Sequence, residues 1–243
     1  MQRSFGRSPA DPRPIQFQRG FTDTTPGSVL ASFGRTQVIC TATATDGVPK
    51  FLQGKGQGWI TAEYAMLPAS TGGRKPRDRA GKVDGRSVEI QRLIGRSVRA
   101  VVDMKLLPEK TIWIDCDVLQ ADGGTRTTAI SGAYVALFDL LRALQGKRQL
   151  REWPLSTQLA GVSVGVVGGV PVLDLDYAED SKADVDMNLV ITGEGEFVEV
   201  QGAAEGATFS RGLLDEMLEL GLAGARTIFA AQRLALELPG GSA

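Results

Sequence analysis

Apolar and polar residues alternate along the first quarter of the chain, and this period of two is typical of β-strands with one buried face. Strands are therefore expected over residues 14–21, 28–33, 36–45 and 59–66. Gly34-Arg35 separates the second and third of these runs by the short turn of a hairpin. The glycine-rich stretch 46–58 predicts a loop before the fourth strand.

The pattern changes to a helical period at about residue 84, and the predicted helix runs to about residue 103. Its apolar stripe consists of Ile90, Leu93, Ile94, Val98, Val101 and Val102. Arg92, Arg96 and Arg99 fall on the opposite face. Arg86 falls near the margin of the stripe in the first turn, so it should be partly covered and need a partner. The ordinary explanation would be that this partner is a carboxylate side chain of the protein.

Residues 111–131 combine a strand, a tight turn and the start of a second helix. β-Branched and aromatic residues open the stretch, Asp122-Gly123-Gly124 interrupts it, and a helix that is apolar on nearly every side begins at Thr125. Such a helix is buried, and its first N–H groups point outward at the positive end of the helix dipole. With the side chains of Thr125 and Arg126, they form an expected anion site. The alternative is an ordinary strand-turn-helix corner in which a threonine caps the helix.

The second half of the chain repeats this order of elements after a polar connector at 146–154. The expected elements are a hairpin over 158–177 with its turn at Gly168-Gly169, strands over 185–192 and 196–203, and an amphipathic helix from Ser210 to about Leu238. Each half thus has a hairpin, a strand with an Asp-x-Asp sequence and a helix. We predict an α/β (α+β) fold of two fused, pseudo-repeated β-α units, as one domain over 1–243 with approximate halves 1–150 and 151–243.

Asp180, Asp184 and Asp186 lie in and just after the stretch 178–184, which is expected to be a loop. Side chains alternate along a strand, so all three share one face if the strand begins early. Asp184 and Asp186 share that face if residues 183–190 are a strand. Carboxylates on one face repel one another and favour a hard cation such as Mg²⁺ or Mn²⁺. The alternative is a solvent-exposed acidic edge.

The chain has 243 residues and no histidine, which excludes Ser-His-Asp and Cys-His catalysis and histidine metal ligands. Cys40 and Cys116 lie in strand-like runs without metal-ligand spacing, so both are expected in the core of a protein from a reducing compartment. No apolar run approaches the length of a membrane span, and the polar N-terminal residues do not resemble a signal peptide. We expect a cytoplasmic protein without a membrane partner.

Charge is distributed unevenly along the chain. Residues 1–105 carry 17 Lys and Arg against 8 Asp and Glu, whereas residues 106–243 carry 10 against 20. Such a division favours a basic surface for a polyanion and an acidic part for a cation or a basic partner. The loop expected over 67–82 concentrates Arg74, Lys75, Arg77, Arg79 and Lys82. The alternative for this charge run is an ordinary solvated surface.

Several stretches together resemble the ribonuclease PH family. They are GQGWITAEYAMLP, GRSVEIQRLIGRSVRAVVD, DCDVLQADGGTRTTAISGA, EDSKADVDMNLV and EVQGAAEG, in the order that the family has. The resemblance implies the ribonuclease PH fold, with mixed sheets and packed helices, and a homo-hexameric ring built as a trimer of dimers. It also implies a phosphate-dependent 3′→5′ exoribonuclease that trims tRNA precursors and other RNA 3′ ends and releases nucleoside diphosphates.

The resemblance also assigns roles to particular residues. Inorganic phosphate, the co-substrate and nucleophile, is expected at Arg86, Gly124, Thr125 and Arg126. Asp180 and Asp186 match the pair associated with catalysis and with a divalent metal, Mg²⁺ or Mn²⁺. The resemblance does not distinguish which of the two is the general acid and which is a metal ligand. RNA contacts are expected at Arg74, Arg77, Arg79, Arg92 and Arg99.

Two other functions are alternatives to phosphorolysis of RNA. A non-catalytic RNA-binding ring subunit of an exosome-like assembly would keep the fold and the basic surface but lose the arginines or the acidic pair, and both sets are present. A small-molecule phosphotransferase is disfavoured because the chain has no G-x-x-x-x-G-K-[ST] loop.

Overall fold

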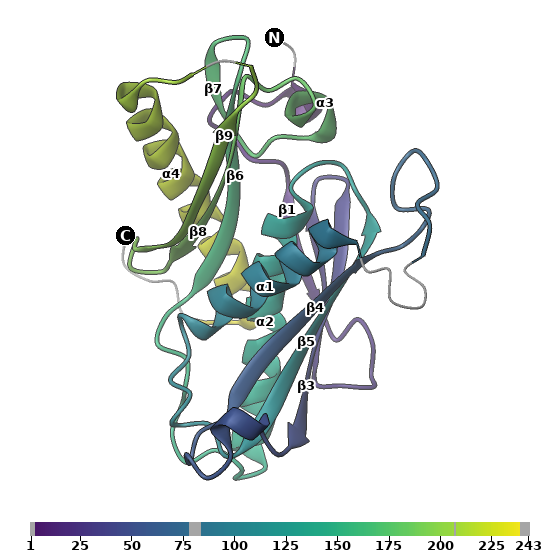
Figure 1. Ribbon diagram of the computed structural model, residues 1–243, viewed down its shortest axis with the longest axis vertical. Helices are drawn as coiled ribbons and strands as arrows, with labels where there is room; N and C mark the ends of the chain where they lie inside the picture. Colours follow the sequence, from purple (N-terminus) through teal and green to yellow (C-terminus); the bar gives the residue numbers. More distant parts are fainter. Residues whose placement is uncertain (1–2, 78–83, 207, 239–243) are drawn as a thin grey trace.

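The computed structural model describes residues 3–77, 84–206 and 208–238, which contain two β-sheets and helices α1 to α4 (Figure 1). The first sheet has the order β1-β2-β3-β5-β4. Its strands are β1 (Ile15–Arg19), β2 (Gly27–Phe33), β3 (Thr36–Asp46), β4 (Trp59–Met66) and β5 (Lys110–Gln120). β4 and β5 are parallel, and helix α1 (Gly85–Arg99) connects them, whereas the other pairs are antiparallel. The first sheet is therefore mixed.

The second sheet is antiparallel and has the order β7-β6-β8-β9. Its strands are β6 (Leu159–Val167), β7 (Val170–Leu173), β8 (Val185–Thr192) and β9 (Phe197–Ala204). A one-turn helix, α3 (Tyr177–Asp180), separates β7 from β8, and α4 (Arg211–Leu236) packs against β6, β7 and β8. Short 3-10 turns occur at Ser4–Gly6 and Lys50–Leu52. The expected α/β fold with packed helices is confirmed, and of its two sheets the first is mixed and the second antiparallel.

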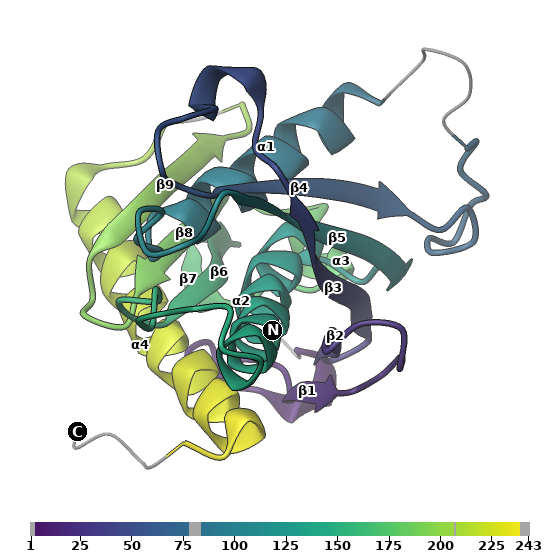
Figure 2. The same ribbon diagram turned by 90° about the horizontal axis from the view of Figure 1, so that it is seen from below.

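Helix α2 (Thr125–Gly146) lies between the two sheets and is buried along most of its length (Figure 2). It packs on β2 and β3 of the first sheet and on β6 of the second. A Cβ at Gly132 would lie 2.7 Å from the Cys40 Sγ, and one at Gly161 would lie 2.7 Å from the Thr127 Cα. The two glycines thus permit a close approach of the helix to β3 on one side and of β6 to the helix on the other.

The same helix corrects the expectation that no apolar run approaches the length of a membrane span. In the part of the chain that the structure describes, α2 is long and apolar enough to cross a membrane by length and composition alone. However, 89% of its apolar window is buried inside the protein, so it serves as the core helix that its all-round apolar pattern predicts.

Two element boundaries differ from the sequence-based expectations. α1 ends at Arg99 instead of about residue 103, because the chain leaves the helix and Val102 forms an isolated bridge with Leu155. The six residues of its apolar stripe are nevertheless buried, as expected. The stretch 178–184 was expected to be a loop but begins inside α3, where Asp176 and Glu179 form a reciprocal capping box.

Cys40 and Cys116 are buried neighbours on β3 and β5, with their sulfur atoms 3.7 Å apart. Both are free thiols, which confirms that they are core residues.

Candidate active site

A cavity of about 630 Å³ opens where the N-termini of α1 and α2 face α3 and β8. It is lined by Met66, Thr71, Gly72, Gly73, Lys75, Arg86, Ala121, Gly123, Gly124, Thr125, Arg126, Ser163, Tyr177, Asp180, Asp186 and Asn188. All the residues expected to hold phosphate, and both aspartates expected to act in catalysis, therefore line one cavity. They come from both halves of the chain, so the cavity is lined jointly by residues of the two halves.

The start of α2 is shaped by two glycines in left-handed conformations. Gly123 has φ 75°, and Gly124, the N-cap residue, has φ 63° and ψ 27°. The backbone N–H groups of the first turn receive no side-chain cap, and Thr125 is already the first helical residue. The alternative in which a threonine caps this helix is therefore wrong, and the anion site expected at the helix start stays a prediction.

Thr125 is held by a tyrosine from the first sheet. The Tyr64 hydroxyl donates to the Thr125 Oγ1 over 2.9 Å, and both side chains are buried. Burial raises the pKa of Tyr64 above its usual value, so the phenol stays protonated and acts as the donor. The threonine hydroxyl then keeps its own proton to donate to an anion.

The two arginines of the cavity differ in their surroundings. Arg86 was expected to be partly covered, but it is exposed, because it lies in the first turn of α1 beyond the buried stripe. Among the described residues Arg86 forms no direct ion pair, although its charge opposes the raised pKa values of Asp180 and Asp186. Arg126 is 15% exposed and donates to the Gln201 Oε1 over 2.9 Å, with the Glu89 carboxylate 3.7 Å away.

The acidic wall is formed by Asp180 and Asp186. Asp180 is the last residue of α3, and Asp186 lies on β8, which begins only at Val185. The expectation that one strand face carries three aspartates is therefore wrong. Asp184 is exposed, accepts from the Gly169 N–H over 3.2 Å and does not line the cavity.

Burial disfavours the ionised forms of the two aspartates. Burial raises the pKa of Asp180, although Arg86 and Arg126 oppose this. Burial and then the charge of Asp180 raise the pKa of Asp186, and Arg126 and Arg86 again oppose the shift. Within the described ranges, no group of three or more Cys, Asp or Glu side chains surrounds a metal site. Asn188 and Ser163 line the same cavity and carry further side-chain oxygens, so the residues present fit a hard cation that keeps several waters.

The residues expected to contact RNA are spread more widely. Arg74 and Arg77 are exposed in the loop beside the cavity, and Arg79 lies outside the described residues. Arg92 and Arg99 line a separate cavity of about 200 Å³ on α1 and β4. Arg99 is half-buried, with its guanidinium 4.5 Å from the Trp59 ring centroid, and it donates to the Ile60 carbonyl over 2.9 Å.

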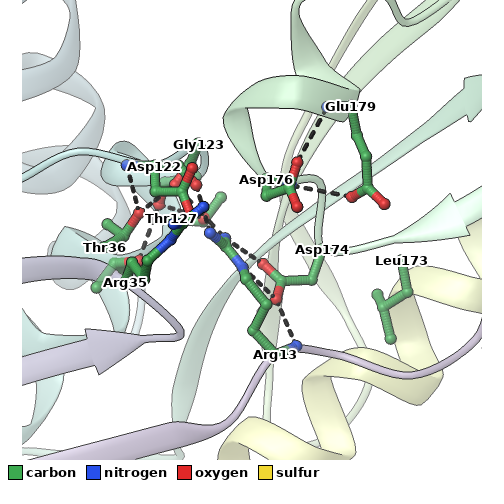
Figure 3. Close-up of polar contacts among 12 residues, drawn as sticks. Arg13, Arg35, Thr36, Asp122, Gly123, Thr127, Leu173, Asp174, Asp176 and Glu179 are labelled. Atoms are coloured by element: carbon green, nitrogen blue, oxygen red, sulfur yellow. Dashed lines mark hydrogen bonds and ion pairs between the residues drawn. The ribbon is translucent and has the colours of Figure 1, made fainter. Parts of the chain in front are cut away.

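Some residues of the site had no signal in the hydrophobic pattern. Tyr177 is 66% exposed at the cavity, and it begins the one-turn helix although it was expected to end the hairpin over 158–177. Arg13, from the polar N-terminal stretch, is buried behind the turn at Gly123 and bonded to its carbonyls (Figure 3). The Asp-x-x-Glu capping box could have revealed the short helix, but nothing local marks Arg13.

Comparison with known protein families is consistent with this geometry. The family model described as 3′ exoribonuclease family, domain 1, matches residues 11–142, and the model described as domain 2 of the same family matches residues 157–224. The chain belongs to the 3′ exoribonuclease family. Within this family, proteins named Ribonuclease PH from Mycobacterium sp. strains KMS and JLS are each 55% identical over 240 residues, 98% of this chain and 92% of theirs.

Solved structures of exosome proteins show the same fold. Rice (Oryza sativa) Rrp46 has a TM-score of 0.79 at 20% identity and covers 97% of this chain and 100% of its own. A chain of the Archaeoglobus fulgidus exosome with RNA bound to the active site has a TM-score of 0.77 at 21% identity, over 94% and 92%. The resemblance to ribonuclease PH is confirmed, and the relatives support a phosphorolytic 3′→5′ exoribonuclease, with phosphate as co-substrate, over a non-catalytic ring subunit.

Proposed function

We propose that this chain trims the 3′ ends of tRNA precursors and other RNAs by phosphorolysis and releases nucleoside diphosphates. The observation that carries the proposal is the cavity in which an uncapped helix start and two arginines face two carboxylates. A cationic wall can hold inorganic phosphate, and an acidic wall can serve the leaving group, without any histidine.

In the proposed reaction, an oxygen of inorganic phosphate attacks the phosphorus of the terminal phosphodiester. The bond from phosphorus to the 3′-oxygen of the shortened RNA breaks, and that oxygen takes up a proton. Two anions must meet, so Arg86, Arg126 and the N–H groups of residues 124–126 would offset their repulsion and align them. The Thr125 hydroxyl, oriented by Tyr64, supplies one further donor.

Asp180 and Asp186, with the side-chain oxygens of Asn188 and Ser163, would hold Mg²⁺ or Mn²⁺. When bound there, such a cation stabilises negative charge that develops on the leaving oxygen. A carboxyl with a raised pKa can also protonate that oxygen, so separate Asp180→Asn and Asp186→Asn variants are needed to distinguish a proton donor from a metal ligand.

The proposal includes a cytoplasmic, homo-hexameric ring, a trimer of dimers, as the resemblance implies. Exposed Arg74 and Arg77, together with Arg79, would bind the RNA backbone near the cavity. Arg92 and Arg99, in the second cavity, would contact more distant phosphates. Arginine contacts of this kind carry little sequence preference, which suits an enzyme that acts on many 3′ ends.

The test is incubation with a 3′-extended tRNA and Mg²⁺, with and without inorganic phosphate, followed by chromatography of the released nucleotides. We expect shortening only with phosphate, and nucleoside diphosphates as the product. Nucleoside monophosphates released at the same rate without phosphate would show hydrolysis and overturn the proposal. Chelation of divalent cations tests the metal separately.

A further inference from the structure

Arg13 is a buried arginine outside the cavity that is bonded to the turn at Asp122-Gly123 and to Asp174, which lies just before α3 (Figure 3). It is 1% exposed and precedes β1 in the chain. It does not line the cavity, so it can affect a bound ligand only through the groups that it holds. A buried guanidinium is retained only when its hydrogen bonds are satisfied.

On one side, Arg13 holds Asp174 through a two-pronged ion pair. The Arg13 Nε lies 2.9 Å from the Asp174 Oδ2 and the Nη2 lies 2.7 Å from the Oδ1, while the Arg13 backbone N–H donates to the Oδ2 over 2.7 Å. Burial alone would lower the pKa of Arg13, but the bonds to Asp174 outweigh it and raise that pKa, so the pair stays ionised. Asp174 is fixed in a left-handed conformation with φ 55°.

On the other side, the same guanidinium donates to the carbonyl of Asp122 and, at 3.5 Å, more weakly to that of Gly123. Thr36 adds to this anchor, because its hydroxyl donates to the Gly123 carbonyl over 2.7 Å and accepts from the Asp122 N–H over 2.9 Å. In a planar trans peptide, the N–H points opposite to the carbonyl. Holding these carbonyls therefore directs the N–H groups of Gly123 and Gly124 away from Arg13, and both glycines line the cavity.

The two sides are in direct contact behind the cavity. A Cβ at Gly123 would lie 2.5 Å from the Leu175 carbonyl oxygen and 2.7 Å from the Asp176 carbonyl carbon. Asp176 in turn caps α3, whose last residue is Asp180. Gly123 thus approaches the segment that leads from Asp174 through α3 to Asp180, and Arg13 is bonded both to the turn and to Asp174 at the start of that segment.

We propose that Arg13 is a positioning residue that sets the distance between the phosphate-binding turn at Gly123-Gly124 and the segment from Asp174 to Asp180. The inference rests on the proposed function of that cavity. Arg13 would thereby align the attacking phosphate with Asp180, although Arg13 itself contacts neither of them.

The chain offers a matched control in Arg3. This arginine is 5% exposed and donates to the Glu179 Oε1 over 2.6 Å and to the carbonyls of Leu173, over 2.6 Å, and Asp174, over 3.3 Å. It therefore holds the same segment as Arg13 but, among the described residues, has no bond to the turn. Arg3→Lys and Arg13→Lys both keep the charge and lose the fork of donors. They should lower the temperature of unfolding to a similar extent.

The experiment measures the dissociation constant for inorganic phosphate by calorimetry without RNA, and the phosphate KM and kcat of phosphorolysis. Misplacement of the turn should raise both phosphate constants at least about tenfold in Arg13→Lys, whereas Arg3→Lys should change them by less than about twofold. Thr36→Val removes the two hydrogen bonds to the turn without burying an unpaired charge, and it should raise both phosphate constants by about threefold. This variant tests the turn if Arg13→Lys does not fold.

Equal phosphate constants in Arg13→Lys and Arg3→Lys, or unchanged constants in Thr36→Val, would overturn the inference and reduce Arg13 to a stabilising residue. The calorimetric measurement separates this outcome from a failure of the proposed function. A wild-type protein that binds phosphate but releases no nucleoside diphosphate would refute the function, and the effect of Arg13 on phosphate binding would still be decided.

Discussion

The two walls of the cavity hold charge in opposite ways. The wall proposed to bind phosphate consists of Arg86, Gly124, Thr125 and Arg126 from the first half of the chain. Hydrogen bonds within the protein hold two of its donors: Tyr64 donates to Thr125, and Arg126 donates to Gln201. The acidic wall comes from the second half, and its two carboxyls have raised pKa values because burial disfavours both charges and the charge of Asp180 further disfavours that of Asp186. One wall is therefore organised before a ligand arrives, whereas the other gains stability from a cation or a proton.

The largest effect is expected on the phosphate wall. Arg126→Ala should lower the turnover of phosphorolysis by about a hundredfold, because it removes a charged donor from the transition state. Arg86→Ala should act similarly. The measurement is initial rate against phosphate concentration, with Arg142→Ala, an exposed arginine of the same helix, as the control. Turnover near that of the wild type at saturating phosphate would remove Arg126 from the site.

The acidic wall should show opposite signs for activity and stability. Asp186→Asn should reduce turnover strongly but raise the temperature of unfolding when no divalent metal is added, since it removes a charge that the folded state disfavours. RNA binding should persist, because carboxylates do not attract RNA. A variant less stable than the wild type under these conditions would contradict the electrostatic account of this wall.

The pH dependence follows from the same shift. Because the folded protein raises the pKa of Asp186, ionisation destabilises the fold above that pKa, and the penalty is lost as the pH falls to the usual range for aspartate. The stability difference between Asp186→Asn and the wild type should therefore be largest near neutral pH and vanish in acid. Unfolding curves of both proteins across this range provide the measurement.

The smallest effect is expected outside both walls, in the basic loop. Arg74→Ala with Arg77→Ala should raise the KM for precursor tRNA several-fold and flatten its logarithmic salt dependence by about 0.7–0.9 per lost phosphate contact. The phosphate KM should not change. Arg211→Ala with Arg226→Ala, two exposed arginines of α4, is the matched control. An unchanged tRNA KM and salt slope would return Arg74 and Arg77 to an ordinary solvated surface.

Local patterns predicted the elements well because each strand and helix buries a face that its own residues define. Among the described residues, the nine strands and three long helices lie within a few residues of their expected ranges. Errors arose where tertiary packing decides: α1 ends early because Val102 pairs with Leu155, and Arg86 is exposed where a helical projection placed it near the buried stripe. A one-turn helix such as α3 is too short to show a period.

The site was only partly predictable for a related reason. Glycine and arginine at a helix start predict an anion site from the local sequence, whereas the catalytic role of Asp180 and Asp186 came from family resemblance. Both assignments remain predictions. The bond from Arg13 to Asp174 joins residues 161 positions apart, and no local pattern records such a pairing. Buried ion pairs of this kind emerge only when the fold is known.

The burial of α2 between the sheets has a consequence for folding. Each sheet covers one side of this helix, so a fragment that ended near residue 150 would leave the apolar side facing β6 in water. Separating the halves would therefore expose apolar surface both on α2 and on the second sheet, which is unfavourable in water. The two matched family domains should therefore unfold in one cooperative transition, with neither half persisting as an independent intermediate.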